Sequence, residues 1–147
     1  MLPVSLVVFE SWHAAELMAR NEMGVTDCYF LEPAAAKVIE DRGNAFTLLA
    51  NEEVVACGGT LPLWPGRNTA WMIFTPGAGR YMRRITRMVK RELDLTPGRV
   101  EMTVVKDYAL GHRWARMLGF EVETPCLREY GPLREDHTGY VKLNGVE

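Results

Sequence analysis

The sequence predicts one mixed α/β domain over residues 1–147, and three observations support this fold class. The chain is 48% hydrophobic and 24% charged, so it can bury a real core and has an ordinary globular composition. Short apolar strand-like runs alternate with amphipathic helical segments in the order β-α-α-β-β-β-α-β-α-β-β, without a linker or an internal repeat. One strand–turn–helix unit, at residues 71–93, organises that order. We therefore expect a mainly antiparallel sheet with flanking helices.

The N-terminal third predicts one strand and two helices. Residues 4–9 are β-branched and apolar, which is typical of a strand. Ser11 can cap a helix that ends near Gly24. A second helix is expected to start at Glu32-Pro33 and end at Gly43, because proline suits the first helical turn and glycine the position after the last.

The next segment predicts an antiparallel hairpin. Two apolar runs, residues 45–49 and 54–57, flank the polar turn at residues 51–53. Gly58-Gly59 indicates a bulge or a close backbone approach in the second strand. Residues 61–66 contain two prolines, so we expect a turn-rich connection there and not a paired central strand.

The central unit has the architecture of an anion site. Residues 71–74 can form a buried strand, Thr75-Pro76-Gly77-Ala78-Gly79 a tight turn, and a helix is expected to open at Arg80. The first N–H groups of a helix lack intrahelical partners, and the helix dipole favours negative charge there. A glycine turn in this position is also common for structural reasons alone, so both interpretations stay open.

The helix that follows is amphipathic and strongly basic. Its expected buried face has the helical spacing of Tyr81, Ile85, Met88, Val89 and Glu92/Leu93. Its other face carries Arg83, Arg84, Arg87, Lys90 and Arg91. Such a charge run is often only a solvated surface. If the surface is functional, most of its cations lie too far from the turn to contact one bound cofactor. They fit an acidic protein or a nucleic acid better.

The C-terminal third predicts the remaining elements. Residues 100–105 form a strand, residues 108–118 a helix that ends at Gly119, and residues 120–123 and 140–143 the last strands around a loop at 131–136.

Bulk properties exclude several classes of protein. The formal charge of −2 gives no global argument for nucleic acid or an anionic membrane. Cys28, Cys57 and Cys126 have no metal-ligand spacing and are interpreted as free thiols of a reducing compartment. No apolar run approaches the roughly 20 residues that a membrane helix needs, and the N-terminus does not fit a signal peptide. We expect a protein of the cytoplasm, or of a particle assembled there.

The element order, the glycine turn after the fourth strand and the helix end Leu118-Gly119-Phe120 resemble the GNAT acyl-CoA N-acyltransferase family. The likeness covers residues 46–143 and extends less specifically to Val4. In that family the pantetheine of acyl-CoA contacts the fourth strand and its pyrophosphate the turn. The resemblance implies that Ile73 and Phe74 lie beside pantetheine, and that the pyrophosphate meets Gly77, Ala78, Gly79 and Arg80.

Within this family the chain is similar to GNAT-like proteins of short-tailed phages, some of them internal virion proteins. The residues that carry this likeness are Ala56-Cys57-Gly58-Gly59, Trp71-Met72-Ile73, the basic helix and residues 111–120. The resemblance implies the phage virion or the host cytoplasm as location. It also implies other virion proteins or a second copy of the chain as partners, with the basic helix as the docking face.

Several positions depart from the enzyme pattern. Phe74 stands where the enzymes usually have Gln or Arg, Ala115 where they commonly have a tyrosine acid, and Tyr108 at or near an expected asparagine. An acyltransferase needs a base for the amine and an acid for the thiolate. Asp107 and Tyr108 are candidates for these roles, although Asp107 also fits a helix N-cap. The other candidate bases have structural interpretations. Glu52 and Glu53 are expected to be turn residues, and Glu101 a strand residue that faces solvent.

Two functional hypotheses follow. In the first, the chain is a structural or interaction component of a phage particle, has reduced or no acetyltransferase activity, and needs no cofactor. In the second, it is an active N-acyltransferase that moves an acetyl group from acetyl-CoA to an amine. His13, His112 and His137 show no ligand spacing, and Cys57 is interpreted as a small buried residue.

Overall fold

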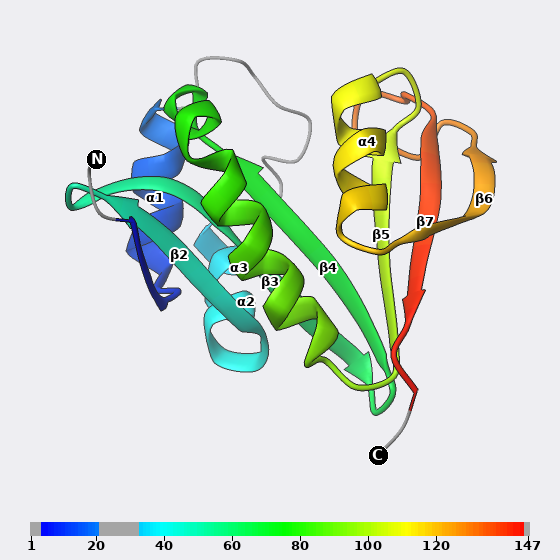
Figure 1. Cartoon of the computed structure of the whole chain (residues 1–147), viewed down its shortest axis with the longest axis horizontal. Helices are drawn as coiled ribbons and strands as arrows, with labels where there is room; N and C mark the ends of the chain where they lie inside the picture. The colour runs from blue at the N-terminus through cyan, green and yellow to red at the C-terminus, as the bar shows by residue number, and fades with distance from the viewer. Residues whose placement is uncertain (1–3, 21–32, 146–147) are drawn as a thin grey trace. The chain divides into compact units, whose positions relative to one another are not determined.

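The computed structural model describes residues 4–20 and 33–145 and confirms the predicted order of strands and helices. Among these residues it adds the 3₁₀ helix η2, before the basic helix (Figure 1). The predictions for Gly24, Cys28 and Glu32 lie outside the described residues. The elements are β1 (Val4–Val8), α1 (Ser11–Arg20), α2 (Pro33–Arg42), β2 (Asn44–Ala50), β3 (Glu53–Trp64), β4 (Arg67–Phe74), η2 (Pro76–Tyr81), α3 (Met82–Asp94), β5 (Arg99–Val105), α4 (Ala109–Met117), β6 (Glu121–Leu127) and β7 (His137–Leu143).

The strands form one seven-stranded sheet in the order β1-β2-β3-β4-β5-β7-β6. The pairs β1–β2, β2–β3, β5–β7 and β6–β7 are antiparallel, and β4–β5 is parallel. The chain divides into two compact units, Met1–Leu61 with Trp71–Ile85 and Pro62–Ala70 with Thr86–Glu147. Each unit is described by itself below, and the single domain stays a prediction.

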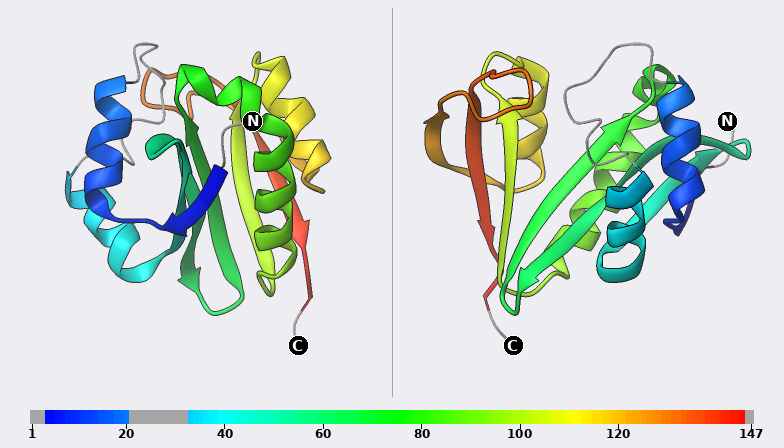
Figure 2. Two further views of the ribbon diagram at one scale, coloured as in Figure 1. Left: turned by 60° about the vertical axis from the view of Figure 1, so that its left-hand side comes forward. Right: turned by 180° about the vertical axis from the view of Figure 1, so that it is seen from behind.

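In the first unit, α1 and α2 lie side by side on one face of the strands (Figure 2). The end of α2 is as predicted, because the Gly43 N–H donates to the carbonyl of Ile39 at 2.8 Å. The hairpin β2–β3 is also confirmed, with Asn51 and Glu52 at φ of 52° and 65° in its turn. The core beneath the helices is apolar and consists of Phe9, Ala14, Leu17, Ala36, Ile39, Val54, Cys57, Trp71 and Ile73.

Gly58 and Gly59 mark a close backbone approach, as predicted. A Cβ atom at Gly59 would lie 2.4 Å from the carbonyl oxygen of Asn44 and 2.5 Å from Cα of Ala45, on the neighbouring strand β2. At Gly58 it would lie 2.8 Å from the carbonyl oxygen of Trp71. The register shift of the hairpin falls elsewhere, between Leu48 and Leu49.

Cys57 is completely buried in this core. Burial raises the pKa of its thiol to about 11, so the thiol stays protonated at neutral pH. Since the thiolate is the nucleophilic form, the interpretation of Cys57 as a small buried residue is confirmed.

His13 is a buried histidine held in its neutral form. Its Nδ1 accepts hydrogen bonds from the backbone N–H of Glu10 at 2.9 Å and from the hydroxyl of Thr47 at 2.8 Å. Only 2% of His13 is exposed, and this burial lowers the pKa of the imidazole below its ordinary value of 6.5. The bond from the Glu10 N–H needs an unprotonated Nδ1, so protonation would break this bond and bury a charge.

We therefore expect His13 to make the fold less stable in acid. Below about pH 6.5 the unfolded chain binds a proton that folded His13 does not bind, so the free energy of unfolding falls as the pH falls. The loss approaches about 1.4 kcal/mol per pH unit for this one group. Urea denaturation of the wild type and of His13→Gln should show a constant stability difference above about pH 7 that shrinks in acid. A difference that does not change with pH would contradict this expectation.

The connection expected at residues 61–66 is wrong in extent, because β3 continues to Trp64 and β4 begins at Arg67. Only Pro65 and Gly66 form the turn, with Gly66 at φ 90°. Residues 62–66 are exposed, and an exposed strand end tolerates a missing N–H. The guanidinium of Arg67 lies 4.5 Å over the ring of Trp64 and ties the two strand ends together.

In the second unit, α4 packs on β5 (Figure 1), and β7 pairs with both β5 and β6. The expected N-cap at Asp107 is wrong. Tyr108 occupies that position without a side-chain cap bond, and its carbonyl accepts from His112 N–H at 3.2 Å. Gly119 ends the helix as predicted, at φ 94°.

Glu101 does not face open solvent as expected. Its carboxylate is half-buried and accepts hydrogen bonds from Arg67 Nε at 2.6 Å and from Arg99 Nε at 2.6 Å. The bond from Arg67, reinforced by that from Arg99, holds the pKa of Glu101 below its ordinary range. Arg99 also pairs with Glu123, so these four side chains form one ion-pair network across β4, β5 and β6.

In the part of the chain that the structure describes, no helix is long and apolar enough to cross a membrane.

Candidate functional site

The first part of the candidate site is the end of β4. Ile73 is buried and Phe74 is half-buried. The next residue, Thr75, is anchored to β3, because its N–H and its hydroxyl both donate to the carbonyl of Val55, at 2.9 and 3.0 Å. These two bonds fix the position of Thr75, where β4 ends and the turn begins.

The turn is helical, and the expected helix start at Arg80 is wrong. The 3₁₀ helix η2 begins at Pro76 and passes directly into α3, with the N–H of Met82 donating to the carbonyl of Gly79. Proline is favourable in a first helical turn because it lacks the N–H that would have no partner there. As a result, the amides with no helical partner lie nearer the strand than the sequence indicated. The Ala78 N–H already donates to the carbonyl of Thr75 at 3.0 Å.

Gly77 and Gly79 have no structural reason to be glycine. Both are exposed, and a Cβ atom at either one would have no atom within 4 Å. Neither has the positive φ that excludes other residues. Gly59 differs in this respect, because the backbone of β2 leaves no space for a side chain there. Two bare backbone positions on an open surface leave room for a ligand to approach the main chain closely.

The six residues expected to bind a cofactor therefore lie together in the first unit, at the end of β4 and in η2. Ile73 is buried, Phe74 is half-buried, and Ala78 is packed inside with 2% exposure. The exposed ones are Gly77, Gly79 and Arg80. A ligand at the turn can thus contact these three exposed residues of the predicted set, while Phe74 stays partly accessible at the strand end.

The two candidate catalytic residues lie in the second unit, between β5 and α4. Asp107 is exposed. Tyr108 is 56% exposed, and its ring lies over Gly111, where a Cβ atom would meet ring carbon Cδ2 at 2.7 Å. The ring thus packs against Gly111 on one side, while more than half of the Tyr108 surface stays exposed. By contrast Ala115 is fully buried, so this chain has no room for a tyrosine at that position.

A hydrogen bond between the buried Tyr140 and the half-buried His112 was not predicted. The Tyr140 hydroxyl lies 2.6 Å from His112 Nδ1, and His112 Nε2 lies 2.7 Å from the carbonyl oxygen of Lys106. A carbonyl only accepts, so Nε2 carries the proton, and in the neutral ring Nδ1 accepts from the phenol. The sequence held one clue, because a tyrosine in a buried strand needs a partner for its hydroxyl.

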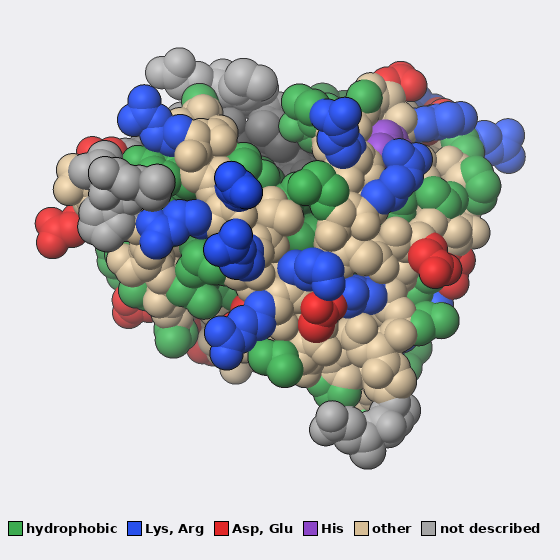
Figure 3. Space-filling model, viewed as in Figure 1, with side chains coloured by type: hydrophobic (Ala, Val, Ile, Leu, Met, Phe, Trp, Pro, Cys, Tyr) green, Lys and Arg blue, Asp and Glu red, His purple; other side chains and the backbone are tan. Residues whose placement is uncertain are grey.

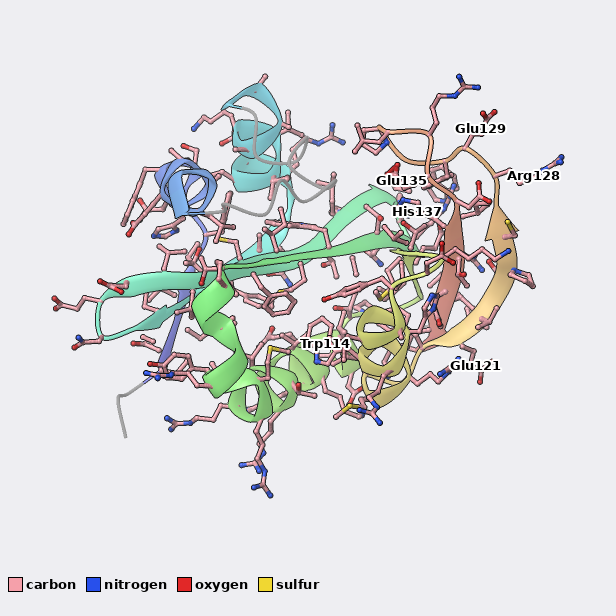
Figure 4. All side chains as sticks on the ribbon, turned by 90° about the horizontal axis from the view of Figure 1, so that it is seen from above. Trp114, Glu121, Arg128, Glu129, Glu135 and His137 are labelled. Atoms are coloured by element: carbon pink, nitrogen blue, oxygen red, sulfur yellow. The ribbon has the colours of Figure 1, made fainter. Side chains whose placement is uncertain are left out.

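A second histidine, His137, was also not assigned a role. It is buried at the start of β7, with Nδ1 at 2.9 Å from the hydroxyl of Thr103 and Nε2 at 3.4 Å from Glu135 Oε1. Glu135 and His137 come from neighbouring positions at the end of the β6–β7 connection (Figure 4). Among residues 4–20 and 33–145, no group of three or more His, Cys, Asp or Glu side chains can hold a metal ion.

The remaining candidate bases have structural roles. Glu52 lies in the hairpin turn at positive φ, and Glu53 opens β3 opposite Ala50. Glu101 is neutralised by Arg67 and Arg99. A carboxylate with a lowered pKa is a weak base at neutral pH, so Asp107 is the exposed carboxylate that stays available beside Tyr108.

The basic face of α3 is exposed as predicted. Ile85, Val89 and Leu93 are buried, and the opposite face carries the exposed cations Arg83, Arg84, Arg87, Lys90 and Arg91. Lys90 pairs with Asp94 at 2.9 Å.

The fold is that of known acetyltransferases. It is similar to the ribosomal-protein-S18-alanine N-acetyltransferase from Escherichia coli, with a TM-score of 0.76 and 18% identity over 99% of this chain and 96% of that chain. A spermidine N-acetyltransferase chimera from Vibrio cholerae and hSSAT gives a TM-score of 0.72 and 16% identity over 96% and 95%. A ribosomal L7/L12 alpha-N-protein acetyltransferase, solved in complex with coenzyme A, gives 0.70 and 11% over 95% and 93%.

No protein-family model matches the chain, and no curated protein sequence matches it. At these identities the similar structures show the fold, which is the mixed α/β GNAT acyltransferase fold expected from the sequence. The closer resemblance to phage virion proteins, and the structural role that it implied, stay predictions.

Proposed function

We propose that the chain is an N-acyltransferase that moves an acetyl group from acetyl-CoA to an amine. The observation that carries this proposal is the turn after β4. There, within a GNAT fold, Gly77 and Gly79 keep an exposed main chain that the fold itself does not require.

Different parts of acetyl-CoA would contact the turn and the end of β4. The pyrophosphate would lie against the exposed main chain at Gly77 and Gly79, where Arg80 supplies a positive charge. The pantetheine would follow the end of β4 at Ile73 and Phe74. Phe74 offers an apolar contact where a polar side chain is expected, so the backbone and Arg80 carry the binding of the phosphates.

The reaction needs a proton acceptor and a proton donor. The amine nitrogen attacks the thioester carbonyl, the C–N bond forms, and the C–S bond breaks. Asp107 takes the proton of the amine, directly or through water, and Tyr108 protonates the CoA thiolate as it leaves. Both side chains are exposed on the same connection, with Tyr108 fixed by its contact with Gly111.

A thermal-shift titration with CoA and acetyl-CoA tests the proposal, followed by a CoA-release assay over a panel of amines. We expect ligand-dependent stabilisation, because binding to the native state raises its melting temperature, and thiol release that depends on the amine. An absence of stabilisation at millimolar acetyl-CoA would overturn the proposal in favour of a non-enzymatic role.

Tyr108→Phe is expected to lower kcat by about 10²-fold while the affinity for acetyl-CoA stays unchanged, because the phenol acts only on the leaving thiolate. The matched control is Tyr130→Phe, which removes an equally exposed phenol from the β6–β7 connection. Steady-state kinetics of both variants would decide. A kcat for Tyr108→Phe equal to that of the control would remove Tyr108 from the mechanism.

A further inference from the structure

A basic surface extends over two helices of the second unit. Its members on α3 are Arg87, Lys90 and Arg91, and its members on α4 are Arg113 and Arg116; all are exposed. We name it the α3–α4 basic surface. Figure 3 shows Lys and Arg side chains following α3 and lying over α4 on the same face. The reaction proposed above uses none of them.

A side-chain hydrogen bond links the two helices. Trp114 reaches from α4 toward α3 (Figure 4), and its Nε1 donates to the hydroxyl of Thr86 at 2.7 Å. Both residues lie within the second unit. The arginines of the two linked helices are therefore treated as one surface.

The positive charge of this surface is not neutralised within the described part of the chain. Asp94 pairs with Lys90 at 2.9 Å and with Lys142 at 2.7 Å, so two cations already share its one charge. Arg87, Arg91, Arg113 and Arg116 form no ion pair with a described carboxylate. Arg87 and Arg91 are four residues apart, and Arg113 and Arg116 three, so each helix carries a like-charge pair that disfavours the free state.

We propose that the α3–α4 basic surface binds an acidic protein segment. A partner with carboxylates at matching spacing would relieve both repulsive pairs. Arginine is suited to this role, because its planar guanidinium binds a carboxylate through two parallel hydrogen bonds.

Apolar side chains favour a protein over a nucleic acid. On α4, Leu110 is 65% exposed and Met117 is 54% exposed, at helical spacing on either side of Arg113. Methionine and arginine are enriched at protein interfaces, where apolar contact supplements charge. Domains that bind nucleic acid are commonly basic as a whole, whereas this chain has a formal charge of −2. The partner is thus an acidic segment that also presents apolar side chains.

Fluorescence anisotropy with a labelled probe tests the proposal. The probe is a glutamate-rich peptide with leucines at helical spacing, and the competitor is a single-stranded DNA of equal charge. Replacing Arg87, Arg91, Arg113 and Arg116 by Gln should weaken peptide binding by about tenfold, because several exposed ion pairs are lost together.

The control variant carries the same change of charge elsewhere, with Gln at Arg42, Lys106, Arg128 and Arg134, and should bind the peptide within about twofold of the wild type. Circular dichroism and thermal melting establish that both variants are folded. Equal losses in the two variants would mean a nonspecific charge effect and would overturn the proposal. It would equally be overturned if the wild type bound the DNA more tightly than the peptide, or bound no peptide.

Discussion

Gly79→Glu is expected to abolish the stabilisation of the protein by acetyl-CoA. At a ligand concentration of 100 times the dissociation constant, the wild type should gain about 2.7 kcal/mol in unfolding free energy. For a chain of this size that gain corresponds to a rise in melting temperature of about 5 to 10 °C. The variant should show no rise, because a carboxylate at Gly79 would repel the pyrophosphate and occupy its place. Thermal melts with and without acetyl-CoA measure both quantities.

The same substitution should leave the unliganded protein unchanged. A side chain at Gly79 projects into open space, and its backbone conformation is one that any residue adopts. Gly79→Gln is the matched control, since it adds the same volume without the charge and separates repulsion from blocking. Undiminished stabilisation of Gly79→Glu by acetyl-CoA would exclude the turn as the pyrophosphate site. The turn of this GNAT fold would then not bind acyl-CoA in this chain.

The sequence predicted most of the fold because hydrophobic periodicity and turn residues act locally. The hairpin β2–β3 is an example. Asn51 and Glu52 adopt positive φ in the turn between two apolar runs. Gly43 and Gly119 end their helices as expected. In each case the information lies within a few residues of the feature itself.

Two element boundaries could not be read in the same way. Residues 61–66 contain prolines that argue against a strand, yet Trp64 and Arg67 stack across a two-residue turn and extend both strands. The helical turn starts at Pro76 because its missing N–H costs nothing there. The first outcome depends on the partner strand, which local propensity does not contain. The second follows from a local signal, proline in a first helical turn, which the glycines at 77 and 79 obscured.

The site was predicted in part. The strand end and the turn were found as a contiguous motif, from Ile73 to Arg80. The partners of Glu101, in contrast, come from positions 34 and two residues away, Arg67 and Arg99. The pairing of His112 with Tyr140 spans 28 residues. Such contacts depend on strand order and register, so they become visible only in the folded chain.

Gly59→Ala is expected to be among the most destabilising single-atom changes in the chain. Its Cβ would lie 2.4 Å from the carbonyl oxygen of Asn44 and 2.5 Å from Cα of Ala45. Both are backbone atoms of β2, so no side-chain rotation relieves the clash, and the two strands must separate locally. We expect a loss of about 3 kcal/mol in unfolding free energy, at the upper end for overpacking. Urea denaturation of the wild type and the variant measures it.

Gly77→Ala is the matched control, because the same methyl group there meets no atom within 4 Å. It should leave stability unchanged, or raise it by up to about 1 kcal/mol by restricting the unfolded chain. Equal destabilisation by the two variants would mean that Gly77 has a structural role, and the argument for an exposed ligand-binding main chain would fail. A stable Gly77→Ala variant that binds acetyl-CoA more weakly than the wild type would instead separate the two kinds of glycine. Gly59 would then serve the packing of β2 against β3, and Gly77 the ligand.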